Sequence, residues 1–313
     1  MNKVIEEILS ASKITIFSHI KTDGDAVGSS LALFEFCKNH GKEVCVAIDS
    51  EMPNHLLFMS NIGNINNNVF FKGDLAIVVD CIDADRVGKN KFKFKNYKKI
   101  INIDHHAGNA MFGALNYVKE AYSSACEVVY DLFDENGIEL SPVMAEDLFT
   151  GLLTDTGNLF YNSATPATFA KAGKLLEISQ KNLEYFTRNL FSDVSMNIFE
   201  LKKMVYNTIE FYDNKRIALI KISNADLAKC GVNMIDTKSV LEIATSIKEV
   251  MVVIEITEGE PETCYVSLRS KGDIDCSVFA EKFGGGGHMH ASGCRIYDTL
   301  ENASKKVLEV VKI

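Results

Sequence analysis

Aspartate and histidine side chains occupy the ends of predicted strands in the first half of this sequence. His19 follows the β-rich stretch KITIFS, and Asp23 and Asp25 lie in the loop that comes next. The apolar stretch LAIVVD ends at Asp80, and the stretch IINID ends at Asp104. An aspartate after a strand is usually a turn former, so each residue alone says little about function. Their recurrence at successive strand ends is what points to chemistry.

Two histidines and a further aspartate extend this set. His105 and His106 directly follow Asp104, and Asp155 closes the predicted helix MAEDLFTGLLTD just before Gly157. A carboxylate at the C-terminal end of a helix faces the negative end of the helix dipole. A residue placed against its local preference suggests a compensating cation.

Six of these side chains form a candidate set of metal ligands. Without a cation they would repel one another strongly if packed together. Carboxylate oxygens with some imidazole and no thiolate suit Mn²⁺ or Mg²⁺ better than structural Zn²⁺. The set is too large for one ion, so we expect two divalent metal ions, Mn²⁺ or Mg²⁺. The expected ligands are His19, Asp23, Asp25, Asp80, His105 and Asp155.

The elements that must position these residues follow from the apolar pattern. In the first half strand and helix patterns alternate, with helices expected near 26–39, 124–136 and 142–154. The runs that end at Asp80 and Asp104 are continuously apolar, as in strands buried on both faces of a parallel sheet. We therefore predict an α/β fold with a doubly wound, mainly parallel sheet, which binds ligands beyond the carboxyl ends of its strands.

The second half of the chain has a different pattern. Residues 165–211 are predicted to be helical throughout, and a smaller mixed α/β domain follows them. Its strands are expected near 216–222, 251–259 and 264–270, and its helices near 236–246, 275–283 and 300–311.

The length of 313 residues fits two domains of about 150 residues each. We expect a metal-binding catalytic domain over 1–190, a helical connector over 191–214 and a substrate-binding domain over 215–313.

The composition is typical of a soluble globular protein. Apolar residues make up 47% and charged residues 24%, and no apolar run approaches the ~18 residues of a membrane helix. The start of the chain lacks the apolar core of a secretory signal, so a cytoplasmic protein is expected. The eight cysteines include no CxxC pair and therefore no zinc-ribbon spacing. The net charge of −9 argues against a protein that coats duplexes non-specifically, but it leaves a phosphate-bearing substrate open.

The motifs as a set resemble those of the DHH phosphoesterase superfamily. They are H-x3-D-x-D-x2-G-S (His19 to Ser29), the strand-end Asp80, the Asp-His-His triplet (Asp104 to His106) and Asp-Thr-Gly (Asp155 to Gly157), in the family's order. Nearer the C-terminus, Arg-Ser at 269–270 and Gly-Gly-Gly-Gly-His at 284–288 resemble the DHH-associated C-terminal domain. The chain as a whole is similar to the two-domain bacterial nanoRNases, also called oligoribonuclease/pAp phosphatases.

The resemblance implies how the metal ligands are divided. One ion would be held by His19, Asp23 and Asp80. The other would be held by Asp25, Asp80, His105 and Asp155, so that Asp80 bridges the two ions.

It also implies roles for the neighbouring residues. Asp104 would orient the histidines, since ligating imidazoles usually need a carboxylate or carbonyl partner. His106 would contact either the substrate phosphate or the side chains that bind the metal ions. The expected catalytic residues are Asp80, Asp104, His105 and His106.

For the C-terminal domain the resemblance implies a grip on the nucleotide. Consecutive glycines let backbone amides approach a phosphate closely, because there is no Cβ in the way. The expected substrate contacts are His106, Arg269, Ser270, Gly284, Gly285, Gly286, Gly287 and His288. Because the metal ligands and this grip lie on separate domains, we expect the active site in a cleft between them.

The implied activity is metal-dependent hydrolysis of phosphoester bonds through two-metal water activation. Short oligoribonucleotides, linear dinucleotides such as pApA, and pAp would be converted to nucleoside 5′-monophosphates. Three alternatives stay open: a cyclic di-AMP phosphodiesterase, a manganese-dependent inorganic pyrophosphatase, and a nucleotide-binding module without activity. The sequence indicates no membrane association and no obligate protein partner, and it leaves a homodimer open because relatives often dimerise.

One loop departs from the family's pattern. After Asp-Thr-Gly, Phe160 and Ala164 stand where several relatives carry an arginine and the first threonine of a Thr-Thr pair. The phosphate contacts of that loop are therefore not expected here. Phe160 or Tyr161 would either stack on a base or pack in the core.

Overall fold

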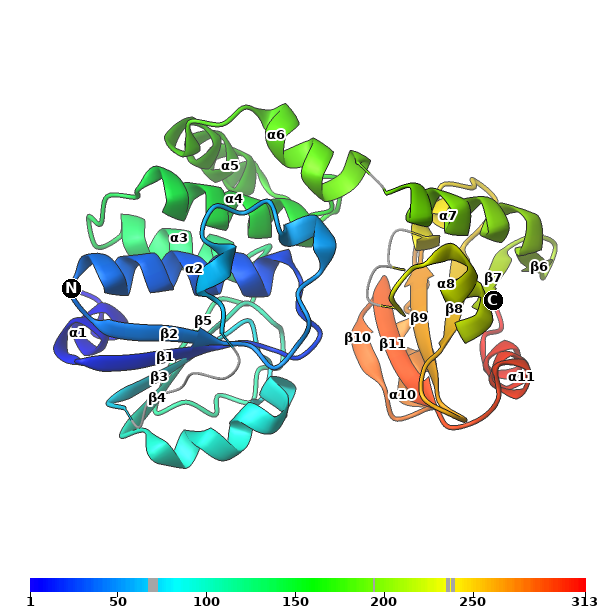
Figure 1. Cartoon of the computed structure of the whole chain (residues 1–313), viewed down its shortest axis with the longest axis horizontal. Helices are drawn as coiled ribbons and strands as arrows, with labels where there is room; N and C mark the ends of the chain where they lie inside the picture. The colour runs from blue at the N-terminus through cyan, green and yellow to red at the C-terminus, as the bar shows by residue number, and fades with distance from the viewer. Residues whose placement is uncertain (67–72, 194, 235–236, 238–239) are drawn as a thin grey trace. The chain divides into compact units, whose positions relative to one another are not determined.

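The chain folds into two compact units, Met1–Asp193 and Val194–Ile313. The structure is a computed structural model. It describes residues 1–66, 73–193, 195–234, 237 and 240–313, apart from the side chains of Glu242 and His288. Figure 1 shows the elements of both units.

The first unit is built on a five-stranded sheet in the order β2-β1-β3-β4-β5, and every pairing in it is parallel. Its strands are β1 (Lys13–Phe17), β2 (Glu43–Ala47), β3 (Leu75–Val79), β4 (Lys99–Asp104) and β5 (Leu115–Val118). Strand β3 is buried along its whole length, as its continuous apolar run predicts. The predicted parallel α/β fold is confirmed. Strand β5 was missed because its half-buried residues LNYV form no apolar run.

Helices cover both faces of this sheet. Helices α2, α3 and α4 lie on one face, and the 3₁₀ segment η3 lies on the other (Figure 1). The bounds are α1 (Lys3–Ser10), α2 (Gly24–Asn39), α3 (Ala125–Asp134), α4 (Pro142–Asp155), α5 (Pro166–Ser179), α6 (Leu183–Thr187), η1 (Asn54–Leu56), η2 (Ile62–Asn64), η3 (Ala84–Asn96) and the π-helical turn η4 (Arg188–Ser192).

The helices next to the sheet begin where the sequence supplies caps. Asp23 accepts a hydrogen bond from the Ala26 N–H and starts α2, and Ser124 does the same for the Glu127 N–H in α3. Each of these helices begins in the segment that follows a strand, α2 after β1 and α3 after β5.

The second unit carries a mixed six-stranded sheet in the order β10-β11-β9-β8-β7-β6. Only β7 and β8 pair in parallel among its described pairings. Apolar clusters cover both faces, one including α11 and the other including α7. The bounds are α7 (Met196–Thr208), β6 (Glu210–Tyr212), β7 (Ile217–Ile222), α8 (Asn224–Cys230), α9 (Leu241–Thr245), β8 (Val252–Glu258), β9 (Cys264–Ser270), α10 (Ser277–Glu281), β10 (Gly286–His288), β11 (Ala291–Ile296) and α11 (Leu300–Val310).

The prediction of unbroken helix over 165–211 was wrong. The helical conformation is interrupted after α5 at Gln180 and Asn182 and after η4 at Asp193 and Ser195, and the C-terminal end of the range is a strand. Glu210–Tyr212 forms β6, which pairs antiparallel with the edge of the sheet at β7. Strand β6 has three residues, and none of them is buried. Its sequence therefore lacks the alternation of apolar and polar residues from which a strand could have been predicted. Within the predicted helix near 236–246 the structure describes α9, and residues 236, 238 and 239 lie outside the described part.

None of the helices in the described part of the chain combines the length and the apolar character that a membrane crossing requires.

Candidate metal centre

Asp80 lies at the centre of the candidate site, directly after β3. Its Oδ2 lies 3.1 Å from Nε2 of His19. Its Oδ1 lies 3.6 Å from Nε2 of His105 and also 3.6 Å from Nδ1 of His106. Asp80 has a φ of 54°, a left-handed conformation that aspartate adopts more readily than most residues. The two carboxylate oxygens thus face different histidines.

His19 and Asp23 form the first group of candidate ligands with Asp80. Nε2 of His19 lies 3.6 Å from Oδ2 of Asp23. The other oxygen of Asp23 accepts the Ala26 N–H at 3.1 Å, which holds the carboxylate at the start of α2. Burial opposes a charge on His19, but Asp23 and Asp80 outweigh it and raise the pKa of His19 to about 10.

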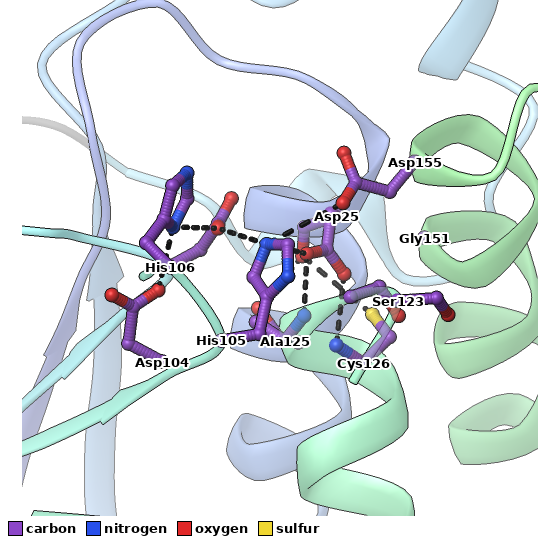
Figure 2. Close-up of polar contacts among 12 residues, drawn as sticks. Asp25, Asp104, His105, His106, Ser123, Ala125, Cys126, Gly151 and Asp155 are labelled. Atoms are coloured by element: carbon purple, nitrogen blue, oxygen red, sulfur yellow. Dashed lines mark hydrogen bonds and ion pairs between the residues drawn. The ribbon is translucent and has the colours of Figure 1, made fainter. Parts of the chain in front are cut away.

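The second group consists of Asp25, His105 and Asp155, and Figure 2 shows them around the His105 ring. Nε2 of His105 lies 3.8 Å from Oδ2 of Asp25 and 3.4 Å from Oδ2 of Asp155. These side chains come from α2, from the end of β4 and from the end of α4. Burial raises the pKa of Asp155 well above its usual value, and the nearby Asp25 raises it further.

The N-terminus of α3 holds Asp25 in place. The backbone N–H groups of Ala125 and Cys126 donate to its two oxygens at 2.6 and 2.8 Å (Figure 2). These bonds direct a carboxylate at the positive end of a helix, where an anion is favoured. Burial raises the pKa of Asp25 to about 7, and Asp80 contributes in the same direction. Gly151 of α4 makes room for this arrangement, because a Cβ there would lie 2.9 Å from the Asp25 Cα.

The two histidines are oriented by different partners. Nδ1 of His105 lies 3.2 Å from the carbonyl oxygen of Tyr122, which turns Nε2 toward the carboxylates. Nδ1 of His106 lies 2.8 Å from Oδ1 of Asp104, and Asn109 donates to the other oxygen of Asp104 at 2.6 Å. The expectation that Asp104 orients both histidines was wrong for His105, whose Nδ1 contacts the backbone carbonyl of Tyr122. Asp104 contacts His106.

The donor chemistry of these groups fits divalent cations. Three sets of His and Asp side chains bring their potential ligand atoms within 4.8 Å of one another: Asp80, Asp104, His105 and His106; His19, Asp23 and Asp80; and Asp25, His105 and Asp155. Buried carboxylates this close need either protons or cations to balance their charge. Oxygen and imidazole donors without a thiolate are those that Mn²⁺ and Mg²⁺ accept. The clusters could therefore hold metal ions.

We expect metal binding at these groups to release protons. A histidine must be neutral to bind a metal, but His19 with a pKa of about 10 carries a proton at neutral pH. Its proton must therefore leave, and the affinity for Mn²⁺ should rise between about pH 6 and about pH 9, by about tenfold per pH unit for each proton released. Titration calorimetry in two buffers of different ionisation enthalpy measures the proton count. A pH-independent affinity with no proton released would contradict this expectation.

The expected substrate residues of the second unit lie on β9 and on or just before the edge strand β10. Arg269 is the second-last residue of β9, pairs with Ala291 of β11 and is partly exposed. The hydroxyl of Ser270 contacts the carbonyl oxygens of Ile274 and Met289 at 2.6 and 3.0 Å, and Nδ1 of His290 at 3.1 Å. Ser270 thus supports the turn between β10 and β11. The backbone of His288 belongs to β10, while its side chain lies outside the described part.

The glycine run serves partly to let β10 approach β11. A Cβ at Gly285 would lie 2.2 Å from the carbonyl oxygen of Gly293, and one at Gly287 would lie 2.5 Å from that of Ala291. Gly284 has a φ of 70°, which disfavours any side chain. At Gly286 a Cβ would meet no described atom within 4 Å. The fold therefore accounts for three of the four glycines and not for Gly286.

Several contacts of the site were missed from the sequence. They are the Tyr122 carbonyl, the amides of Ala125 and Cys126, and Asn109. Backbone groups leave no trace in residue type, and Asn109 in the sequence HHAGNA is indistinguishable from an ordinary turn asparagine. Ser124 was a readable signal, because a serine before an apolar helix marks an N-terminus able to bind an anion.

Comparisons with known proteins agree with the two-unit organisation. Residues 13–152 match the DHH family, N-terminal domain, and residues 214–312 match the DHHA1 domain. A relative from Thermus thermophilus, named bifunctional oligoribonuclease and PAP phosphatase NrnA, is 31% identical over 99% of this chain and 93% of its own. A relative of the same name from Bacillus subtilis is 27% identical over 94% and 93%.

Solved structures show the same fold. The crystal structure of an exopolyphosphatase-related protein from Bacteroides fragilis superposes with a TM-score of 0.90 at 28% identity, over 98% of this chain and 93% of the other. RecJ from Thermus thermophilus in complex with Mn²⁺ gives a TM-score of 0.57 at 12% identity, over 98% of this chain and 52% of RecJ, a likeness of fold alone.

Proposed function

This chain belongs to the DHH family, and we propose that it is a metal-dependent phosphodiesterase and phosphatase of short nucleotides. Its substrates would be short oligoribonucleotides, linear dinucleotides such as pApA, and pAp, with nucleoside 5′-monophosphates as products. The relatives named oligoribonuclease and PAP phosphatase support this assignment. The observation that carries it is the position of Asp80, whose two oxygens face two separate groups of potential ligands.

We assign the two groups to two divalent ions, Mn²⁺ in preference to Mg²⁺. His19, Asp23 and Asp80 would hold one, and Asp25, Asp80, His105 and Asp155 the other. When bound, such ions supply positive charge that lowers the pKa of water and neutralises phosphate oxygens. Asp25 and His105 are held by backbone groups from outside the cluster, so this part of the site is preorganised for a cation.

His106 would contact the substrate phosphate. Burial disfavours a charge on its ring, but Asp104 and Asp80 outweigh this effect and raise the pKa of His106. Asp104 beside Nδ1 favours the protonated ring, which would present an Nε2–H group to the phosphate. Such a donor would stabilise the charge that develops on phosphate oxygens in the transition state. Asp104 and Asn109 would act as positioning residues for this ring.

The second unit would bind the rest of the nucleotide. We assign phosphate contacts to Arg269, His288 and the backbone of Gly284, Gly285, Gly286 and Gly287, with Ser270 beside them. Gly286 supports this assignment, because the fold leaves space for a side chain there. A glycine that the fold does not require is expected where a ligand must approach the backbone closely.

Arg269→Ala should mainly raise the KM for nucleotides and leave the metal content unchanged. Loss of a charge-assisted contact to phosphate removes about 1.5–3 kcal/mol, which corresponds to a rise in KM of roughly 10- to 100-fold. Arg216→Ala, which removes a cation from another part of the same unit, is the matched control. Steady-state kinetics and elemental analysis of bound manganese measure both effects. If the Arg269 variant loses its manganese, we have misplaced the residue.

A product time course tests the proposed function. The protein with Mn²⁺ is incubated in parallel with pAp, pApA, a five-nucleotide RNA, cyclic di-AMP and inorganic pyrophosphate. We expect AMP from pAp and pApA, and nucleoside 5′-monophosphates from the RNA. Turnover confined to cyclic di-AMP or to pyrophosphate would replace the proposal by the corresponding alternative, and turnover of none would overturn it.

A further inference from the structure

Phe160 stands out in the loop that follows the candidate ligand Asp155. Its side chain is 86% exposed, which excludes the alternative that it packs in the core. The neighbouring Leu159 packs against the core of the unit instead. Burial of the ring would have been favourable, so its exposure in the loop after a candidate metal ligand leaves it available for contact with another molecule.

The backbone before Phe160 is strained in a way that turns the ring outward. Gly157, Asn158 and Leu159 have φ values of 55°, 60° and 63°, three left-handed residues in succession. This conformation is uncommon for residues other than glycine and is disfavoured for leucine. Such strain persists only where surrounding contacts enforce it, and it collects at functional sites.

Thr156 supplies the contacts that enforce this turn. Its carbonyl oxygen accepts the N–H groups of Phe160 and Tyr161, each at 3.0 Å. Its hydroxyl accepts the N–H of Leu159 at 3.0 Å and donates to the carbonyl oxygen of Leu152 at 2.6 Å. Because Thr156 is fully buried, the turn is fixed to the end of α4. Phe160 therefore lies one hydrogen-bonded turn beyond Asp155.

The second aromatic ring of the loop has a structural task. The Tyr161 ring packs over Gly157, where a Cβ would lie 2.4 Å from Cζ of Tyr161. Tyr161 thereby covers Gly157, although 56% of its side chain is exposed. Phe160 is the more exposed of the two rings, so it is the better placed to contact another molecule.

We propose that Phe160 stacks on a nucleobase of the substrate and so favours nucleotides over phosphate compounds that carry no base. This inference rests on the proposed function, because it places a substrate phosphate at the metal centre that includes Asp155. The base is joined to that phosphate through the ribose and must lie close to it. A phenyl ring offers no charge for a phosphate, but its face suits any base, and such stacking is tolerant of sequence.

Binding of the reaction product tests the stacking without turnover. AMP and ribose 5-phosphate share the phosphate and the sugar and differ in the base. Calorimetry of the Mn²⁺-loaded protein with each compound gives the contribution of the base to binding. We expect Phe160→Ala to weaken AMP binding by roughly 5- to 100-fold, the usual effect of losing one base–aromatic stack. The affinity for ribose 5-phosphate should not change.

Two further variants separate stacking from an effect on the fold. Phe160→Tyr keeps an aromatic ring and should keep the affinity for AMP. Phe92→Ala removes a ring that is 78% exposed in η3 of the same unit and should change neither affinity. Equal losses for AMP and ribose 5-phosphate in Phe160→Ala, or unchanged AMP binding, would overturn the stacking.

Kinetics with pApA distinguish a failure of this inference from a failure of the proposed function. If the wild-type protein turns over pApA and Phe160→Ala raises the KM with little change in kcat, both stand. If the wild type turns over pApA and the variant matches it, only the stacking fails. If the wild type turns over none of the nucleotides, the proposed function fails and the stacking on a substrate base fails with it.

Discussion

Asp80→Asn is expected to remove nearly all turnover on every substrate. Its Oδ2 faces His19 at 3.1 Å and its Oδ1 faces His105 at 3.6 Å, so both groups of ligands depend on this one carboxylate. An amide keeps the shape but replaces one oxygen donor and the negative charge. Loss of several kcal/mol of transition-state stabilisation corresponds to a fall in kcat/KM of about 1,000-fold or more. Steady-state kinetics on pAp and pApA measure the effect.

Asparagine is the appropriate replacement because the backbone at Asp80 is left-handed, with a φ of 54°. Asparagine tolerates this conformation, so the variant should fold, as circular dichroism will verify. The variant should also bind less manganese than the wild type. Substantial turnover by a folded Asp80→Asn protein would refute the bridging position of this residue.

The second large effect is expected for Asp25→Asn, which should lower both activity and stability. Asp25 is 1% exposed, and both of its oxygens accept backbone N–H groups at the start of α3. In the Mn²⁺-loaded protein, where the cations balance the charge of Asp25, an amide group turns one acceptor into a donor and leaves one of these buried N–H groups without a partner. This costs about 1–3 kcal/mol in the free energy of unfolding. Since loss of a residue that merely supports a ligand costs about 10- to 100-fold, loss of the ligand itself should cost at least about 100-fold in kcat/KM.

Asp147→Asn is the matched control for this prediction. Asp147 is fully buried on α4, accepts a hydrogen bond from Asn61 at 3.1 Å and is not a member of the described metal-binding clusters. We expect its replacement to leave kcat/KM within a few-fold of the wild type, as for substitutions away from reacting groups. Denaturant unfolding and kinetics on both variants separate the effects. Equal losses of activity in the two variants would mean that burial, and not metal binding, explains the result at Asp25.

Most of the first unit could be predicted from its sequence because strands β3 and β4 are largely apolar and are followed by, or end in, polar residues, whereas β5 lacks this pattern. The run LAIVVD is strand β3 followed by Asp80, and the run IINID is β4 ending in Asp104. Parallel strands place their carboxyl ends at one edge of the sheet, which brings Asp80, Asp104 and the following histidines together. Asp155 could be added because its place at the end of a helix is unfavourable without a compensating charge.

Other parts of the site depend on contacts that residue types do not encode. The left-handed backbone of Asp80 decides which oxygen faces which histidine, and aspartate in a loop gives no sign of it. The partner of His105 is the carbonyl oxygen of Tyr122, 17 positions away in the sequence. Backbone groups act as partners wherever the fold brings them, so such contacts become visible only in three dimensions.

The loop with Phe160 illustrates the same limit. Its sequence, NLFY, fits a buried aromatic pair as well as an exposed one. Which side chain is exposed depends on Thr156, whose carbonyl and hydroxyl groups hold the turn, and on the three left-handed residues before Phe160. In this turn Leu159 packs against the core and Phe160 is exposed. The sequence does not distinguish Thr156 from any other threonine near the end of a helix. The glycine run is similar, since only the pairing of β10 with β11 distinguishes Gly286 from Gly285 and Gly287.

Anomalous X-ray scattering at the manganese edge, from crystals grown with Mn²⁺, tests the central claim most directly. Two manganese peaks are expected in the first unit, one beside His19 and Asp23 and the other beside Asp25, His105 and Asp155, with Asp80 in contact with both. A single peak, or two peaks that do not share Asp80, would contradict the two-ion site from which the proposed chemistry follows.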